Sequence, residues 1–165
     1  MIQFGSTISN VPGTRDQVLP FRHLVSCLEN YRRALEAGDL LVIGYDGNQD
    51  GLSATDAYRH PAHAAFPLNM LNVMKRDSDF EGLRPEDFRY EPNWHPRASL
   101  VTHDLVAIRD GWFQLGGEPI RYRATEAFNY SNSYKYPVPV FHSAARIARF
   151  EPAATFIDSQ QRVGL

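Results

Sequence analysis

Residues 100–125, LVTHDLVAIRDGWFQLGGEPIRYRAT, decide the fold because they carry two chain reversals between strand-like runs. Leu100–Arg109 is rich in apolar and β-branched residues, which predicts a strand. Asp110-Gly111 is the strongest hairpin signal in the chain, since this pair suits a two-residue turn between strands. Gly116-Gly117 marks a second reversal, and apolar and basic residues then alternate as in a half-buried strand. The second half is therefore predicted to be an antiparallel meander.

Shorter elements are predicted on either side of this stretch. Two further strands are expected at Val138–His142 and Ala154–Ile157. Phe66–Arg76 (FPLNMLNVMKR) indicates a short helix with a proline near its first turn. Residues 77–98 contain three prolines and many charged residues, which forbid a long regular element. We expect an irregular excursion there, with one helical turn near Pro85–Phe88.

The N-terminal part carries the clearest helix. Apolar residues recur every three or four positions between Gln17 and Ala37, which predicts an amphipathic helix with one buried stripe. The run Leu40–Ile43 (LLVI) then predicts a buried strand. The expected fold class is α+β, with one long amphipathic helix packed on a mostly antiparallel sheet in a single domain over residues 17–165. Residues 1–16 are expected to form an extended N-terminal arm.

Composition narrows the classes of partner. The 165 residues are 43% hydrophobic and 22% charged, with a formal net charge of −2, as in ordinary globular proteins. This balance argues against a nucleic-acid partner bound by phosphate neutralisation. No apolar run has the length of a membrane span or of a signal-peptide core, so no membrane partner and a cytoplasmic location are expected. Cys27 is the only cysteine, which excludes an internal disulfide.

One loop resembles half of a calcium site. Residues 46–51 (DGNQDG) place Asp46, Asn48 and Asp50 at alternate positions, from which their oxygen atoms can converge on one cation. The second half of the loop does not match the calcium-binding pattern, because Ala57 stands where a bidentate glutamate belongs. A tight turn made of turn-favouring residues accounts for the same letters. No cofactor is therefore expected, and a weak Ca²⁺ site at these three residues is the alternative.

The best binding candidate is the stretch 128–137, FNYSNSYKYP, predicted to be a loop. Tyrosine supplies rigid aromatic area, and serine and asparagine supply adaptable hydrogen bonds. The expected interface residues are Phe128, Tyr130, Tyr134 and Tyr136, together with Arg121 and Arg123 on the polar face of the preceding strand. In the alternative interpretation the tyrosines pack onto the sheet and the two arginines form a solvated or salt-bridged face.

Catalytic signatures are sparse. No nucleophile elbow, phosphate-binding loop or dinucleotide-binding glycine pattern is present in the sequence. His103, Asp104, His142 and Arg121 could meet only through the fold. They define an alternative in which the protein is a small hydrolase-like enzyme with a site assembled across the sheet.

Cys27 tests this enzyme alternative. The order of Cys27, Gly38-Asp39-Leu40 and His103 resembles that of cysteine peptidases of the NlpC/P60 kind, and the resemblance implies that Cys27 is a nucleophile. Cys27 lacks the preceding aspartate and the following Ser-Gly of that family. It also projects from the apolar stripe of the predicted helix, which favours core packing over reactivity.

A non-catalytic subunit of a larger assembly accounts for most of these features. Neighbouring subunits would hold the polar segment Met1–Pro20 and the Tyr-rich loop in place, since such termini are ordered only when something binds them. A phage virion component, such as a decoration, neck or tail protein, is one such subunit, and a monomeric binding module is a further alternative. The hypothesis requires the arm to lie on another chain rather than on its own fold.

Overall fold

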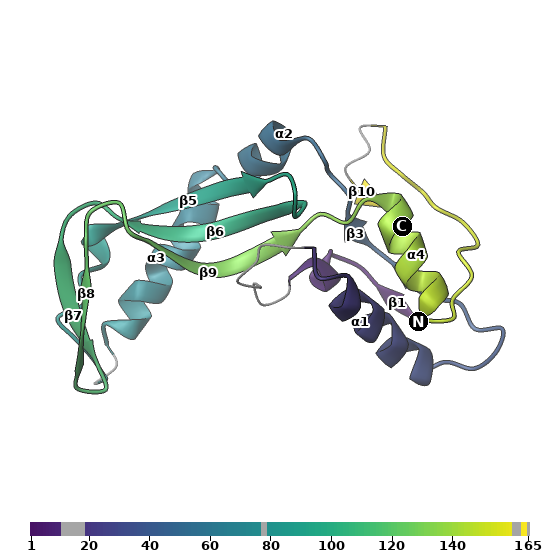
Figure 1. Cartoon of the computed structure of the whole chain (residues 1–165), viewed down its shortest axis with the longest axis horizontal. Coiled ribbons are helices and arrows are strands. Elements are labelled where there is room, and N and C mark those ends of the chain that lie inside the picture. Colours follow the sequence, from purple (N-terminus) through teal and green to yellow (C-terminus); the bar gives the residue numbers. More distant parts are fainter. Residues whose placement is uncertain (11–18, 77–78, 160–162, 165) are drawn as a thin grey trace. The chain divides into compact units, whose positions relative to one another are not determined.

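The computed structural model describes residues 1–10, 19–76, 79–159 and 163–164 and has the expected α+β fold (Figure 1). The chain forms two compact units. Unit 1 comprises residues 1–54, 94–101 and 132–165, and unit 2 comprises residues 55–93 and 102–131. The chain passes between them within α2 (Gly51–Asp56), β5 (Phe88–His95), β6 (Leu100–Ala107) and β9 (Ala127–Tyr134). That residues 17–165 form a single domain stays a prediction. In the described ranges, no helix combines the length and apolarity needed to cross a bilayer.

Unit 1 is built around a parallel strand pair. β1 (Ile2–Gln3) pairs in parallel with β2 (Val42–Ile43), and α1 (Phe21–Arg33) lies between them in the sequence. Parallel neighbours need such a crossover connection, so this is a strand–helix–strand unit. β3 (Tyr45–Asp46) pairs antiparallel with β10 (Val163–Gly164). The unit also contains the 3-10 helix η1 (Thr7–Ser9) and α4 (Val138–Ile147).

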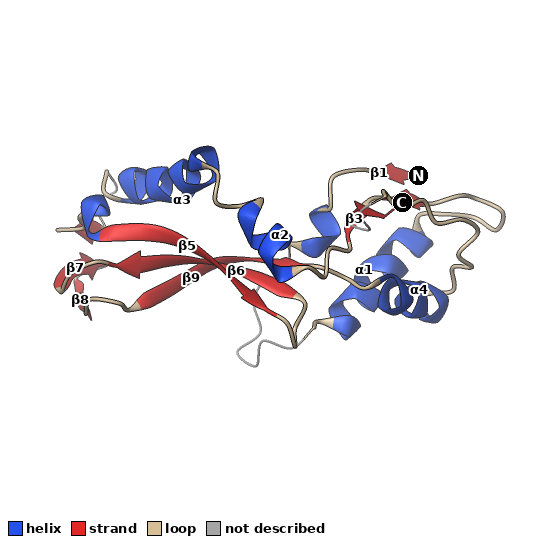
Figure 2. Ribbon diagram, turned by 90° about the horizontal axis from the view of Figure 1, so that it is seen from above, coloured by secondary structure: helices blue, strands red, loops and turns tan. Residues whose placement is uncertain are grey.

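Two helices form the core of unit 1 with the strands. Figure 2 shows α1 and α4 on the same side of β1 and β3. Leu24 and Leu28 of α1 pack in one buried cluster with Phe141 and Ala144 of α4 and with Ile43 of β2. The buried stripe of α1 confirms the predicted amphipathic helix, although its regular turns begin at Phe21 and end at Arg33.

The described part of the expected arm belongs to this unit. Residues 11–16 lie outside the described residues, but Met1–Asn10 contains β1 and η1. The amino group of Met1 donates to the Leu40 carbonyl at 2.7 Å, and Ile8 and Ser9 are buried. The segment therefore packs on its own unit, which removes the reason for expecting a neighbouring subunit to order it.

The predicted strand at Val138–His142 is wrong, because these residues form the first half of α4. The proline in the first turn needs no hydrogen-bond acceptor for its nitrogen. Phe141, Ala144 and Ala145 recur at helical spacing and are buried. A five-residue window was too short to separate this period from that of a strand. The strand expected at Ala154–Ile157 is also absent from the described residues, where Ile157 makes one isolated bridge.

Unit 2 contains a helix, a small sheet and most of a second sheet. β4 (Phe80–Glu81), β7 (Gly111–Leu115) and β8 (Glu118–Tyr122) form an antiparallel sheet in the order β4-β7-β8. β5, β6 and β9 are neighbours in that order. α3 (Pro61–Met74) runs along one face of β5 and β6 in Figure 2. Leu71 of α3 is buried together with Leu83, Phe88, Leu105 and Phe113.

The two predicted turns have different outcomes. Gly116-Gly117 joins β7 to β8 with positive φ angles of 57° and 84°, which confirms the predicted reversal. Asp110-Gly111 was wrongly predicted to close a hairpin, since β6 and β7 lie in different sheets. The Asp110 carboxylate accepts a hydrogen bond from the Ala124 amide at 2.8 Å. Gly111 is instead the first residue of β7 and pairs with Tyr122 of β8.

Residues 77–98 are more regular than predicted. They include β4, the 3-10 helix η2 (Pro85–Asp87) and the eight-residue strand β5, and η2 confirms the expected helical turn. Pro92 lies inside β5. A proline is tolerated there because β5 is an edge strand in the order β5-β6-β9 and has ladder partners on one side.

Candidate functional site

The carboxyl ends of β1 and β2 define the candidate site in unit 1. In parallel sheets, ligands bind in the crevice outside these strand ends, where the following loops supply polar groups. The segment after β1 runs through Gly5 to Asn10, and the segment after β2 runs from Gly44 through the short strand β3 into residues 47–50. Several polar side chains, most of them buried or half-buried, gather in these loops and in the segments next to them. We call this group the strand-end cluster; it comprises Ser6, Ser9, Asn10, Asp46, Asn48, Gln49, Ser99, Ser133 and Lys135.

Ser6 links the two strand-end loops. Its Oγ accepts a hydrogen bond from the Asp46 amide at 2.9 Å and lies 2.8 Å from Ser9 Oγ. Gly5 has a φ of 81° and Ser6 a φ of 35°, so the chain turns sharply as it leaves β1. This turn places the Ser6 hydroxyl next to the Asp46 amide at the end of β3.

A buried ion pair anchors the cluster. The Lys135 ammonium donates to Asp46 Oδ2 at 2.5 Å, and the exposed fractions of the two side chains are 2% and 29%. A buried ammonium is costly unless a counter-charge and hydrogen bonds compensate it. The pair is close to neutral as a unit, so it fixes the position of the loop after β2 without leaving a net charge in the site.

Gln49 ties a third segment to the same place. Its amide nitrogen donates to the Lys135 carbonyl at 2.8 Å, and its amide oxygen accepts from Ser99 Oγ at 2.8 Å. Ser99 precedes β6 and has a φ of 45°, a strained conformation for a residue other than glycine. Loops distant in sequence are thus held together by side-chain hydrogen bonds.

The loop 46–51, where a weak calcium site was the alternative to a tight turn, is organised by hydrogen bonds from its own backbone amides. The Oδ1 atoms of Asp46, Asn48 and Asp50 accept from the amides of Asn48, Asp50 and Leu52 at 3.0, 3.0 and 3.1 Å. These are successive Asx turns, and the last of them caps α2. Within the described ranges, no group of three or more His, Cys, Asp or Glu side chains is arranged to hold a metal ion. The calcium site stays a prediction.

Asn10 and Ser133 form the neutral part of the strand-end cluster. Ser133 Oγ donates to Asn10 Oδ1 at 3.4 Å, and Asn10 is exposed whereas Ser133 is 7% exposed. The exposed amide of Asn10 beside this buried hydroxyl can donate to and accept from a polar ligand.

Unit 2 has its own candidate binding group around His103. The ring centroids of Tyr58, Tyr90 and Tyr130 lie 4.6, 6.0 and 6.0 Å from that of His103, which is 5% exposed. His103 Nδ1 and the Tyr90 hydroxyl share a hydrogen bond of 2.7 Å. Burial, and then the neighbouring tyrosines, raise the pKa of Tyr90 above its usual value, so the hydroxyl stays protonated. Aromatic faces of this kind contact flat rings or cations.

The residues proposed from sequence as a Tyr-rich loop divide between the units. Phe128, Tyr130 and Tyr134 lie on β9 rather than in a loop, and Tyr134 and Tyr136 are fully buried in the core of unit 1. These two tyrosines are therefore packed inside the protein, as in the alternative interpretation, and are not exposed interface residues. Tyr130 faces His103. The alternation of aromatic and polar residues from 128 to 131 is the signal that could have indicated the strand.

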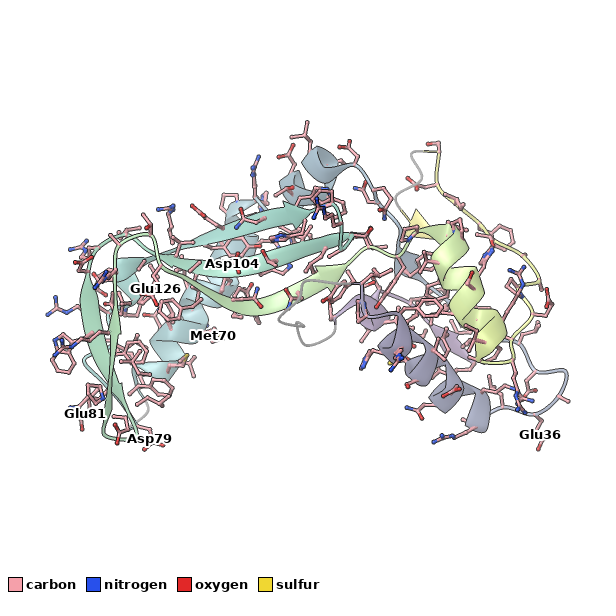
Figure 3. All side chains as sticks on the ribbon, viewed as in Figure 1. Glu36, Met70, Asp79, Glu81, Asp104 and Glu126 are labelled. Carbon is pink, nitrogen blue, oxygen red and sulfur yellow. The ribbon has the colours of Figure 1, made fainter. Side chains whose placement is uncertain are left out.

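The remaining candidates do not converge in one site. His103 and Asp104 are neighbours on β6, so their side chains point to opposite faces. Asp104, labelled in Figure 3, accepts from Thr102, Asn93 and Asn129. In unit 1, His142 lies on α4 and its Nε2 is 2.9 Å from Thr155 Oγ1.

Arg121 and Arg123 lie at the other sheet of unit 2. Both are exposed, at and just after the end of β8, on either side of the buried Tyr122. Their expected role in an interface stays a prediction.

Comparison with known proteins decides the family. All of residues 1–165 match the family model described as "Histidine-specific methyltransferase, SAM-dependent". The chain belongs to this family. Over 111 residues, which are 67% of this chain, it is 26% identical to the N-methyltransferase fsqC of Aspergillus fumigatus. The match covers 30% of that relative, so the chain spans about a third of its length.

Membership of this family corrects the function expected from sequence. A non-catalytic structural subunit and a virion component are both wrong, since the family and the relative are methyltransferases. The misleading feature was the polar N-terminal segment, interpreted as an arm on a neighbouring subunit. Its described part instead supplies β1 and the strand-end loop with Ser6 and Asn10. A polar loop at a strand end has the same composition as a disordered terminus.

The family name implies S-adenosylmethionine (SAM), and the strand-end cluster does not by itself suit that molecule. A nucleoside is usually held by a glycine-rich turn at a helix N-terminus and by a carboxylate on its ribose hydroxyls. Asp46, the last residue of β3, already accepts hydrogen bonds from Lys135 and from the Asn48 amide. No glycine-rich dinucleotide pattern occurs in the sequence. The strand-end cluster, as far as the structure describes it, therefore lacks the groups that usually hold a nucleoside.

Proposed function

We propose that this chain supplies the acceptor-binding part of an N-methyltransferase that acts on histidine or a related nitrogen base. The observation that carries the proposal is the match of the whole chain to the histidine-specific, SAM-dependent family model. The name of the relative, an N-methyltransferase, supports nitrogen as the accepting atom.

The electrostatics of the strand-end cluster support a nitrogen acceptor. A nitrogen accepts a methyl group through its lone pair, so the base must bind without a proton on that nitrogen. An uncompensated carboxylate nearby would favour the protonated, unreactive form. Asp46 is neutralised by Lys135, and Asn10 and Ser133 are neutral hydrogen-bonding groups. The cluster can therefore orient an imidazole or amine without raising its pKa.

The role of this chain is binding and orientation. Asn10 can accept from or donate to polar groups of the acceptor, and Ser133 fixes the position of the Asn10 amide. Ser6 and Gln49 hold the two strand-end loops in place around it. Precise placement of a reacting atom is itself worth several orders of magnitude in rate.

Titration of the isotopically labelled chain with L-histidine, followed by amide NMR shifts, tests this function. We expect saturable shifts that concentrate at Asn10 and Ser133. Asn10→Ala and Ser133→Ala should weaken the affinity about ten-fold, by the loss of one or two hydrogen bonds to a polar ligand.

Asn30→Ala and Ser143→Ala, at exposed positions on α1 and α4, are matched controls that should leave histidine affinity unchanged. The proposal is overturned if neither histidine nor other imidazoles and amines give saturable shifts. It is also overturned if binding occurs but the control and cluster variants behave alike.

A further inference from the structure

Unit 2 carries four aromatic side chains that the proposed function does not use. Tyr90, His103 and Tyr130 stand on the neighbouring strands β5, β6 and β9, and Tyr58 comes from the residues between α2 and α3. All four residues belong to unit 2. We call them the aromatic corner.

Three of the rings form a triangle. The ring centroids of Tyr90 and His103 lie 6.0 Å apart, those of His103 and Tyr130 also 6.0 Å, and those of Tyr90 and Tyr130 6.4 Å. The planes of Tyr90 and His103 are within 8° of parallel, whereas Tyr130 is tilted from them by 59° and 51°. Tyr58 stands at 81° to His103, with its centroid 4.6 Å away. The rings therefore face in several directions, as in a corner rather than a stack.

The corner is buried at its base and open at its rim. His103 is 5% exposed, whereas the three tyrosines are half-buried. Phe88 and Leu105, two positions along their strands from Tyr90 and His103, pack in the same core cluster as Leu71 of α3. The core of unit 2 therefore supports the base of the corner, while part of each tyrosine side chain stays in contact with solvent.

A hydrogen bond fixes the base. The Tyr90 hydroxyl and His103 Nδ1 lie 2.7 Å apart. Burial, and then Tyr130, Tyr58 and Asp104, raise the pKa of Tyr90 above its usual value, so its hydroxyl stays neutral. Two of the rings are thus held in position without a charge being placed between them.

The electrostatics of the corner favour a cation. The face of an aromatic ring carries a negative potential. Asp104 follows His103 on β6, and the hydrogen bonds described for its carboxylate come from the neutral side chains of Thr102, Asn93 and Asn129. An anion would be repelled by these groups, and a neutral molecule would gain contact area alone. A cation gains both contact area and electrostatic attraction.

We propose that the aromatic corner binds the methylated ammonium group of an organic cation. A nitrogen centred over the triangle of Tyr90, His103 and Tyr130 would lie within about 6 Å of all three centroids, the range in which a cation and a ring attract each other. Methyl groups pack well on ring faces, whereas a primary ammonium needs strong hydrogen-bond acceptors when it leaves water. The strand-end cluster lies in unit 1, so this inference does not depend on the proposed function.

A charged ligand and its neutral isostere test the chemistry. Choline and 3,3-dimethyl-1-butanol have the same shape, but the alcohol carries a carbon atom in place of the charged nitrogen. We expect choline to give saturable shifts of the His103 and Tyr130 ring signals in NMR spectra of the labelled chain, and the alcohol to bind at least about five-fold more weakly. Equal affinities, no saturation by choline, or shifts confined to other residues would overturn the inference.

Substitutions of one ring locate the site. Tyr130→Leu removes a ring face and should weaken choline binding at least about three-fold, whereas Tyr130→Phe keeps the face and should bind like the wild type. Trp112→Leu, at a 55% exposed aromatic position elsewhere in unit 2, should leave the affinity unchanged. Circular dichroism checks that all three variants fold. Wild-type affinity in Tyr130→Leu, or equal losses in Tyr130→Leu and Trp112→Leu, would contradict the assignment.

Methylated ammonium groups occur on free solutes and on lipid headgroups, and flotation with phosphatidylcholine vesicles distinguishes the two sources. Flotation of the chain that excess choline reverses assigns a headgroup. Choline binding without flotation assigns a free solute. If choline binds at the corner but histidine gives no saturable shifts, the proposed function is wrong and the cation site holds.

Discussion

At the scale of single residues, the unequal burial of Asp46 and Lys135 gives the first prediction. Asp46→Asn leaves a 2% exposed ammonium without this carboxylate, whereas Lys135→Met leaves a carboxylate that is 29% exposed and can be hydrated. We expect Asp46→Asn to lower the free energy of unfolding by about 3–5 kcal/mol and Lys135→Met by about half as much. Urea unfolding at pH 7 measures both.

An exposed ion pair provides the control for this comparison. Asp56 and Arg59 pair on the surface, with 64% and 61% of their side chains exposed, so Asp56→Asn should cost less than about 1 kcal/mol. Equal losses for Asp46→Asn and Lys135→Met would show that burial does not set the energetics of the pair.

Tyr122 gives a pH dependence in unit 2. Burial first, and then a hydrogen bond to Asp87, raise the pKa of Tyr122 from 10.0 to about 12. The unfolded tyrosine therefore loses its proton at a lower pH than the folded one. The stabilisation is present below pH 10 and is lost as pH rises through about 12, by about 1.4 kcal/mol per pH unit between the two values.

Comparison with Tyr122→Phe isolates this effect. At pH 8 we expect the variant to be about 1–3 kcal/mol less stable, because Asp87 loses a hydrogen bond. The difference should shrink as pH rises from 10 to 12, because only the wild-type tyrosine ionises on unfolding. Guanidinium unfolding at several pH values measures it, and a constant difference would contradict the prediction.

The loop 46–51 gives a ligand prediction. The Oδ1 atoms of Asp46, Asn48 and Asp50 already accept backbone amides, and Asp46 Oδ2 accepts from Lys135. A cation would have to displace these donors. We therefore expect the melting temperature to be the same in calcium and in a chelator, and an increase of several degrees in calcium would show that the loop does bind the ion.

At the scale of elements, the hairpin of β7 and β8 depends on a glycine. A Cβ built on Gly111 would lie 2.3 Å from the hydroxyl oxygen of Tyr122, its partner on β8, whose side chain is 2% exposed and hydrogen-bonded to Asp87. The ring has no room to move aside. We expect Gly111→Ala to cost about 1–3 kcal/mol or more through overpacking.

Gly116→Ala is the matched control in the same hairpin. A Cβ there meets nothing within 4 Å, so its cost comes from the positive φ of 57° alone and should be about 1 kcal/mol. Urea midpoints of the two variants give the comparison. Equal losses would show that the contact with Tyr122 does not make the substitution at position 111 especially costly.

At the scale of the whole molecule, the exposed apolar side chains of Ile2, Phe4, Leu40 and Val42 on the paired strands β1 and β2 should make the isolated chain prone to association. Phe4 is 67% exposed beside other apolar side chains, whereas Leu52 is 76% exposed on a different element. Contiguous apolar patches drive association, and single exposed residues do not. We expect Phe4→Ser to reduce concentration-dependent light scattering of the chain and Leu52→Ser to leave it unchanged. If Leu52→Ser reduced the scattering and Phe4→Ser did not, the surface that drives association would lie elsewhere.

Part of the candidate site could be named from the sequence. Asp46 and Asn48 were singled out for their spacing, and Tyr130 and His103 for their residue type, and each lies in one of the two candidate groups. Their partners were not predicted. Lys135 pairs with a residue 89 positions away, and Ser133 with one 123 positions away. No local pattern encodes separations of this size.

The sequence by itself determined the α+β class, the amphipathic helix α1 and the Gly116-Gly117 reversal, because helical periodicity and turn chemistry depend on residues close in the chain. The tertiary structure decided which strands pair, so that β7 joins β4 and β8 instead of β6. It also decided that the polar N-terminal residues form β1 and one side of the strand-end cluster. Pairing and burial depend on contacts between distant segments, whose free energy is absent from any short window of sequence.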